Sequence, residues 1–165
     1  MCGRFGISTD IENLQDFFVF DPTSVDYVKR YNIAPTDPVL TYGALGTETA
    51  QYMRWGLIPS WWKTDSGRKL PPLINARAET LTANKMFKDA FQRKRCLILA
   101  NGFYEWRKNS DGSTTPFRVG LTGWEPFGMA GLWDTWSGPN GRIYSCTIIT
   151  TTPNELTTEI HDRMP

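Results

Sequence analysis

Residues 95–112 read RCLILANGFYEWRKNSDG, and this stretch decides the fold class. The apolar run from Arg95 to Ala100 predicts a buried strand. From Phe103 to Lys108 the side chains alternate, which predicts a second strand. Asn109-Ser110-Asp111-Gly112 then supplies turn-forming residues, so the second strand should fold back as one arm of a hairpin.

Strand patterns continue on both sides of this stretch. Downstream they recur at residues 116–121, 127–136 and 142–150, with a strong turn signal, Ser137-Gly138-Pro139-Asn140-Gly141, before the last run. Upstream, residues 39–42 and 49–55 predict a hairpin whose loop contains Gly43 and Gly46.

Three helical segments interrupt the strands. Thr9 and Glu12 form a capping-box pattern that predicts a helix reaching Asp21-Pro22. Apolar spacing predicts a second helix over residues 83–92, and Thr152-Pro153-Asn154-Glu155 predicts the start of a third. Without repeats or linkers, residues 1–165 should form one α+β domain. Its strands, mainly antiparallel, should make a curled, barrel-like sheet with a few short helices.

Composition limits the function classes. The chain is 40% hydrophobic and 21% charged, as in ordinary soluble domains, and no apolar run approaches the roughly 20 residues of a membrane span. The N-terminal segment does not resemble a signal peptide, so we expect a cytoplasmic protein. A net charge of +1 means that any nucleic-acid site must be a local basic surface.

Cysteine and histidine are scarce. The chain has three cysteines, an odd number without paired spacing, which argues against a disulfide framework. With only one histidine and no CxxC motif, it also has too few ligands for a structural zinc site. We therefore expect no metal and no cofactor. Cys96 and Cys146 lie in apolar strand patterns and should be core residues.

Cys2 is the first candidate for chemistry. Aminopeptidases remove an initiator Met before a small residue, which leaves an α-amine and a thiol on one carbon skeleton. The amine has an ordinary pKa of about 7.7–8.0, so part of it is neutral at pH 7. Such a pair can condense with an aldehyde to a Schiff base and then close a thiazolidine ring. A simple packed cysteine at position 2 is the equally weighted alternative.

Two titratable residues are further candidates. His161 lies in a polar His-Asp-Arg string, where proton transfer and a structural role have even weight. Glu105 lies between Tyr104 and Trp106, whose bulk would desolvate its carboxyl group and raise the pKa. A solvated strand-face glutamate is the alternative for Glu105.

Binding candidates follow from two loops. Asn75 and Arg77 point to one face after the stiff Pro71-Pro72 pair, as a phosphate or sugar site would need, or as an ordinary edge strand. Trp61 and Trp62 lie in a polar loop, where they can stack on bases or fold back onto the core.

Six segments together resemble one family, the SOS response-associated peptidase-like (SRAP) proteins, which process abasic sites. They are residues 1–5 (MCGRF), 31–35 (YNIAP), 55–59 (WGLIP), 74–79 (INARAE), 102–106 (GFYEW) and 161–165 (HDRMP), in the family's order. The resemblance implies that a bacterial member acts in the SOS response and associates with the nucleoid on damage, and that a eukaryotic one is nuclear. It also implies that the family domain continues past Pro165, so we expect a domain without that C-terminal segment.

The resemblance implies a role for each matching residue. Cys2 would form a thiazolidine crosslink with the aldehyde of an abasic site in single-stranded DNA or at a single-/double-strand junction. Asn75 would orient the sugar or the cysteine, while Glu105 and His161 would move protons. DNA contacts would come from Arg4, Trp61, Trp62, Arg77, Trp106 and Arg163. A monomer is expected. A thiol (auto)peptidase using Cys2 and His161, or a non-catalytic binding module, would use the same residues.

Overall fold

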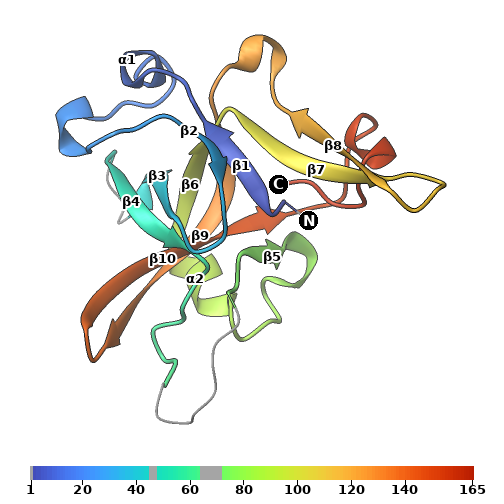
Figure 1. The fold of residues 1–165 in the computed structure, drawn as a ribbon. Helices are drawn as coiled ribbons and strands as arrows, with labels where there is room; N and C mark the ends of the chain where they lie inside the picture. The colour runs from blue at the N-terminus through green and yellow to red at the C-terminus, as the bar shows by residue number, and fades with distance from the viewer. Residues whose placement is uncertain (1, 45–47, 64–71) are drawn as a thin grey trace.

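The computed structural model describes residues 2–44, 48–63 and 72–165. Gly46, which the sequence places in a hairpin loop, Pro71 and Met1 lie outside the described residues. One of the two sheets has four strands in the order β2-β1-β7-β8 (Figure 1). Its strands are β1 (Arg4–Ile7), β2 (Arg30–Ile33), β7 (Gly102–Lys108) and β8 (Thr114–Val119).

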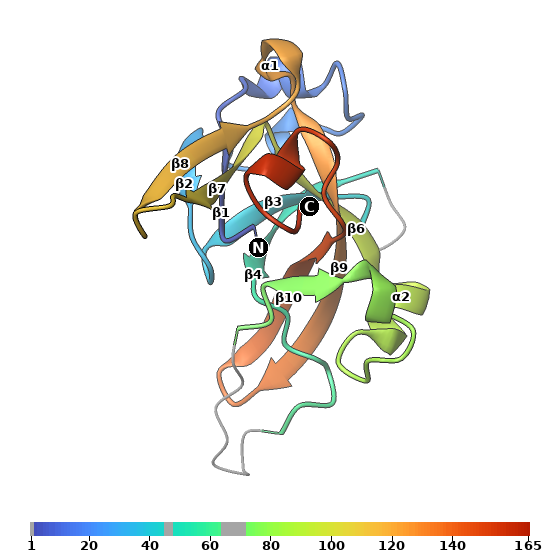
Figure 2. The ribbon, with the colours of Figure 1, turned by 90° about the vertical axis from the view of Figure 1, so that its right-hand side faces the viewer.

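The larger sheet curls until the strand at one of its ends pairs with a strand near the other end. Its order is β4-β3-β6-β9-β10-β5, and β4 also pairs with β10, so five of its strands close a barrel (Figures 1 and 2). The strands are β3 (Pro38–Tyr42), β4 (Ala50–Trp55), β5 (Asn75–Arg77), β6 (Arg95–Ala100), β9 (Phe127–Gly138) and β10 (Gly141–Thr150). The α+β class and the curled, barrel-like sheet are confirmed.

Two pairings of the larger sheet are parallel. Strand β10 runs parallel to β4 through the Cys146–Trp55 pair, and it runs parallel to the short β5. The second pairing sets Ile148 beside Asn75 and Thr150 beside Arg77. It therefore brings the predicted Asn75 and Arg77 site to the edge of the barrel.

The helices are shorter than the sequence predicts. They are α1 (Ile11–Leu14), η1 (Pro22–Ser24), η3 (Ala78–Thr80), α2 (Lys88–Arg93), η4 (Thr122–Trp124) and η5 (Thr157–Glu159). In the part of the chain that the structure describes, none of them is long and apolar enough to cross a membrane.

Local side-chain bonds explain the wrong helix boundaries. The Thr9 capping box is wrong, since Asp10 is the N-cap of α1 and its side chain makes no cap bond. The side chain of Asn84 accepts from the Met86 N–H, a turn that competes with a helix start, so α2 begins only at Lys88. Asn154, not Thr152, accepts from the Thr157 N–H, so only a short 3-10 turn forms there.

The core joins the two sheets. The rings of Phe5 in β1 and Trp55 in β4 meet edge to face at 5.1 Å, and both side chains are fully buried. Cys96 and Cys146 are buried, as the sequence predicts. The contact between Phe5 and Trp55 fixes the start of the chain against the barrel.

Candidate active site

Four predicted site residues come from distant parts of the chain to one place. Cys2 precedes β1, Asn75 opens β5, Glu105 lies within β7, and His161 follows η5. The N-terminal end of β1 and the C-terminus of the chain lie side by side in both ribbon views (Figures 1 and 2). Contacts between these four residues define the site.

Asn75 holds the backbone of Cys2. Its side-chain Nδ2 donates to the carbonyl oxygen of Cys2 at 2.9 Å. The residue before it is anchored twice, because the Ile74 carbonyl accepts from the Trp55 indole at 2.9 Å and from the Ile148 amide at 3.0 Å. The other amide atom, Oδ1, is buried and has no hydrogen-bond partner among the described residues. That oxygen can accept a hydrogen bond from a substrate.

The Cys2 thiol is enclosed. The residue has no exposed surface, and Sγ lies 3.8 Å from the Arg4 carbonyl, to which it can donate. Burial, reinforced by the negative charge of Glu105, raises the pKa of the Cys2 thiol to about 12. The thiol is therefore neutral at physiological pH.

Strand alternation turns Glu105 inward. Phe103 and Glu105 lie on the buried face of the smaller sheet, and Glu105 is only 4% exposed. Trp106 lies on the opposite face and is 41% exposed. The Glu105 carboxylate Oε2 lies 3.9 Å from Nε2 of His161. Glu105 is therefore desolvated, whereas the sequence left a solvated strand-face position open as the alternative, and the structure adds its imidazole neighbour.

Two groups compete for the other nitrogen of His161. The Arg163 backbone N–H donates to Nδ1 at 3.0 Å, and Asp162 Oδ1 lies 2.8 Å from the same nitrogen. The amide can only donate and the carboxylate can only accept, so the two bonds belong to different protonation states. The amide is fixed, whereas the Asp162 side chain is 86% exposed. The neutral ring therefore carries its proton on Nε2, towards Glu105.

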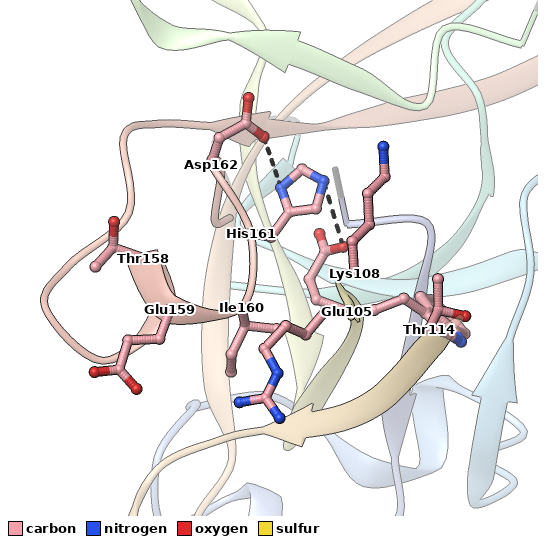
Figure 3. A pocket seen from close by; sticks show the side chains of 10 residues that line it. Glu105, Lys108, Thr114, Thr158, Glu159, Ile160, His161 and Asp162 are labelled. Carbon is pink, nitrogen blue, oxygen red and sulfur yellow. Dashed lines mark ion pairs between the residues drawn. The ribbon is translucent and has the colours of Figure 1, made fainter. Parts of the chain in front are cut away.

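A pocket of about 720 Å³ opens beside this pair. Figure 3 shows Glu105 and His161 pointing towards one another, with Lys108 and Thr114 close by. The sequence did not single out Lys108 or Thr114. Their only signal is that they flank the predicted hairpin turn that follows Glu105.

The predicted DNA-binding residues lie on several different elements and do not form one cluster. Arg4 donates to the Asn32 side chain at 3.1 Å, and Arg77 is exposed at the end of β5. Trp61 is 46% exposed, and its ring centroid lies 6.2 Å from that of Trp62. Arg77 and Trp61 are therefore available to a ligand, as the exposed Trp106 is, whereas Arg4 and Trp62 are only partly exposed.

The Trp61-Trp62 loop is held against the barrel. The Ser60 amide donates to Asp134 at 2.7 Å, and the Trp136 indole donates to the Trp62 carbonyl at 2.7 Å. Asp134 is buried and pairs with Lys94 at 2.5 Å. The sequence gives no sign of this support, because Asp134 is 74 residues from Ser60.

Arg163 differs from the other predicted DNA contacts. Its guanidinium donates to both carboxylate oxygens of Glu79 at 2.9 Å and to the Thr150 carbonyl at 2.6 Å. Its side chain is 12% exposed. Arg163 is thus engaged within the protein rather than presented on the surface.

No metal site accompanies these residues in the described part of the chain. Within residues 2–44, 48–63 and 72–165, no group of three or more His, Cys, Asp or Glu side chains is arranged to hold an ion. The site therefore consists of a thiol, a carboxylate, an imidazole and an amide.

Comparison with solved structures places the fold. A protein from Bacteroides thetaiotaomicron superposes with a TM-score of 0.85 at 24% identity, over 99% of this chain and 75% of that one. A protein from Bordetella bronchiseptica gives a TM-score of 0.82 at 24% identity, over 99% of this chain and 82% of that one. At this identity the likeness establishes the fold.

Sequence relatives are closer. YoqW of Bacillus subtilis (strain 168), named an abasic site processing protein, is 41% identical over all of this chain and 75% of its own length. YedK of Escherichia coli (strain K12), named in the same way, is 32% identical over all of this chain and 74% of its own length. HMCES of Xenopus tropicalis, also named an abasic site processing protein, is 39% identical over 68% of this chain and 40% of its own length. The family described as SOS response associated peptidase (SRAP) matches residues 1–165, so this chain belongs to the SRAP family.

Proposed function

We propose that this protein captures abasic sites in single-stranded DNA through a covalent bond to a mature N-terminal Cys2. The observation that carries the proposal is the convergence of Cys2, Asn75, Glu105 and His161. Asn75 binds the Cys2 carbonyl at 2.9 Å, and Glu105 lies 3.9 Å from His161 while its charge acts on the Cys2 thiol. Relatives named as abasic site processing proteins support the same substrate.

The chemistry uses the open-chain aldehyde of the abasic sugar. After Met1 is removed, the free α-amine of Cys2 attacks the aldehyde carbon, and the resulting carbinolamine loses water to give a Schiff base. The thiol sulfur then adds to the imine carbon, and its proton passes to the nitrogen. The product is a five-membered thiazolidine that contains N, Cα, Cβ and Sγ of Cys2 and the former aldehyde carbon, with one water released.

Each neighbour has a defined part in this sequence. The proton on Nε2 of His161 and the carboxylate of Glu105 form a proton relay beside the reacting carbon, suited to opening the sugar and expelling water. Asn75 fixes the Cys2 carbonyl, and its buried Oδ1 can accept from the amine or from a sugar hydroxyl. The enclosed thiol adds last, after the imine has formed.

The DNA path follows from exposed cationic and aromatic side chains. Arg4 and Arg77 flank the reacting group on β1 and β5 and would contact phosphates, which makes binding salt-sensitive and independent of sequence. Trp106 and Trp61 are both more than 40% exposed and would stack on bases. A single strand suits this surface, since its bases can unstack and place their faces against an aromatic side chain.

A thiol peptidase is the second candidate, and the family description contains the word peptidase. Such enzymes need a thiolate, which a histidinium or another cation stabilises by lowering the thiol pKa. In the chain that begins with Met1, burial raises the pKa of the Cys2 thiol to about 12. The neutral, buried thiol therefore favours amine-first capture of an aldehyde over peptide hydrolysis.

The experiment mixes the Met1-processed protein with a single-stranded oligonucleotide that carries one abasic site. Denaturing electrophoresis then detects the covalent product. An intact strand, the Cys2→Ala variant and the Cys96→Ala variant are the controls, because Cys96 is a second buried thiol. Removal of Met1 is verified by mass spectrometry.

The expected result is a slow band with the abasic strand for the parent protein and for Cys96→Ala, and none for Cys2→Ala. A Cys2→Ser variant should give at most a transient adduct, because oxygen closes a weaker ring. A stable band from Cys2→Ala would overturn the proposal. Peptide turnover without any band would favour the peptidase.

A further inference from the structure

The contacts of Arg163 point to a role different from the DNA contact that the resemblance implies. Both terminal nitrogens meet Glu79 at 2.9 Å, and Nη2 also donates to the Thr150 carbonyl at 2.6 Å. The hydrogen bond from Arg163 holds the pKa of the Glu79 carboxyl below its usual range. The pair is therefore charged throughout the neutral pH range and forms a two-pronged contact of fixed orientation.

This ion pair joins two segments that each carry a site residue. Glu79 lies in η3, which follows β5 directly, and β5 begins with Asn75. Arg163 lies two residues after His161. The partners are 84 positions apart, so the pair ties the segment that binds Cys2 to the segment that carries the imidazole.

The same residue reaches His161 through its backbone. The Arg163 N–H donates to Nδ1 of His161 at 3.0 Å, which directs the proton of the neutral ring to Nε2 and towards Glu105. The next residue is also fixed, since Met164 and Thr151 exchange two backbone hydrogen bonds of 2.8 and 3.1 Å. Glu79 and the Thr150 carbonyl hold the Arg163 side chain, so loss of Glu79 removes one of the restraints on the amide that selects the histidine tautomer.

We propose that Glu79 is a positioning residue for the reaction at Cys2. Through Arg163 it holds His161 in the place and tautomer that face Glu105. This inference rests on the proposed function for its kinetic test, but the tautomer can be observed without any DNA.

The kinetic test uses Glu79→Ala, because the two roles of Arg163 predict opposite results. If Arg163 binds a phosphate, removing the neighbouring carboxylate frees a cation and tightens DNA binding, and the reaction at saturation is unchanged. If Glu79 positions His161, the crosslinking rate at saturating abasic DNA falls about tenfold or more, with the half-saturating concentration unchanged. Glu125→Ala removes another exposed carboxylate, at the end of η4, and is the matched control.

The spectroscopic test uses the single histidine. Because His161 is the only one in the chain, the imidazole ¹⁵N signals of the labelled protein report one ring. We expect the Nε2–H tautomer in the parent protein and in Glu125→Ala, and a mixture of tautomers in Glu79→Ala. Glu79→Gln keeps an acceptor for Arg163 and should fall between the two, which separates positioning from general loss of folding.

The outcomes are distinguishable from failure of the proposed function. If the parent protein gives no crosslink, the proposed function fails, and the histidine spectra alone decide the role of Glu79. Unchanged spectra, or an unchanged maximal rate in Glu79→Ala with tighter DNA binding, would overturn the positioning role. A slower maximal rate together with a shifted tautomer would establish it.

Discussion

The Asn75 side chain donates a 2.9 Å hydrogen bond to the carbonyl of Cys2 across 73 residues of sequence. This bond places the reacting end of the chain against β5, whose register is set by the parallel pairing with β10. An N-terminal nucleophile would otherwise be free to move, since chain termini are poorly ordered unless they are tied down. The position of Cys2 therefore depends on the pairing of β5 with β10.

Asn75→Ala should slow crosslinking more than it weakens DNA binding. The variant loses the hold on Cys2, so the maximal rate should fall about tenfold, while the folded state loses only about 1 kcal/mol with one hydrogen bond. Single-turnover rates at increasing abasic DNA would measure both quantities. Asn13→Ala, an exposed change in α1, should behave like the parent protein. An unchanged maximal rate would remove Asn75 from the site.

Cys2 should react slowly with iodoacetamide, and Glu105→Gln should speed that reaction. With a pKa of about 12, only about one Cys2 thiol in ten thousand is ionised at pH 8. The Glu105 charge disfavours the thiolate, so removing it lowers the pKa and raises the alkylation rate at a given pH.

Mass spectrometry of the N-terminal peptide across pH would follow alkylation of Cys2 alone. Glu125→Gln, which changes a surface carboxylate, should leave the rate unchanged. Slower alkylation in Glu105→Gln would show that the carboxylate does not repel the thiolate.

The fold was predictable where its signals are local. Each strand predicted from residue 95 to residue 150 appears in the structure, although β8 (Thr114–Val119) lies two residues before the predicted 116–121, and Gly112 has a positive φ of 83° in the first hairpin. The parallel contacts of β10 with β4 and β5 were not predictable, because they join residues far apart and depend on how the barrel closes. The helices were predicted too long, since side chains such as Asn84 and Asn154 bond to the backbone in ways that spacing does not reveal.

The site was predictable as a set of residues and not as an arrangement. Cys2, Glu105 and His161 each have chemistry that a sequence displays, and the family motifs group them. Their partners do not: nothing in the sequence links Arg163 to Glu79, and the pairing of β10 with β5 and of Thr151 with Met164 brings their two segments together. Arg163 therefore looked like a surface contact although it is largely enclosed.

Stability should fall at alkaline pH, in part because of Cys96. Burial raises the pKa of the Cys96 thiol to about 12, above its ordinary unfolded value. The stabilising contribution is complete below about pH 9 and is lost as the pH rises towards 12, at about 1.4 kcal/mol per pH unit. Urea unfolding under reducing conditions at pH 8 and pH 10 should give a smaller decrease for Cys96→Ala than for the parent protein. Equal decreases would mean that this thiol does not contribute.

Arg77→Ala should weaken DNA binding without changing the chemistry. The guanidinium is exposed at the end of β5, and loss of one phosphate contact should reduce the slope of log K against log salt by about 0.7 for a single strand. Fluorescence anisotropy with an abasic strand at several salt concentrations would give the slope. Arg142→Ala changes an exposed arginine on the distant β9–β10 hairpin and should leave it unaltered. Equal slopes for the two variants would exclude a contact at Arg77.

Trp61→Ala should weaken binding of long strands and spare short ones. Trp61 is 46% exposed on a loop that Asp134 and Trp136 hold in place, so it is a preformed stacking surface at a distance from Cys2. Loss of one stacked base costs about 1–3 kcal/mol. Trp124, also 46% exposed, lies on η4 and is the matched control. Half-saturating concentrations for crosslinking, measured with abasic strands of increasing length, should diverge between Trp61→Ala and Trp124→Ala only once the strand reaches the loop. If they agree at every length, the DNA does not reach Trp61, and its exposure must have another cause.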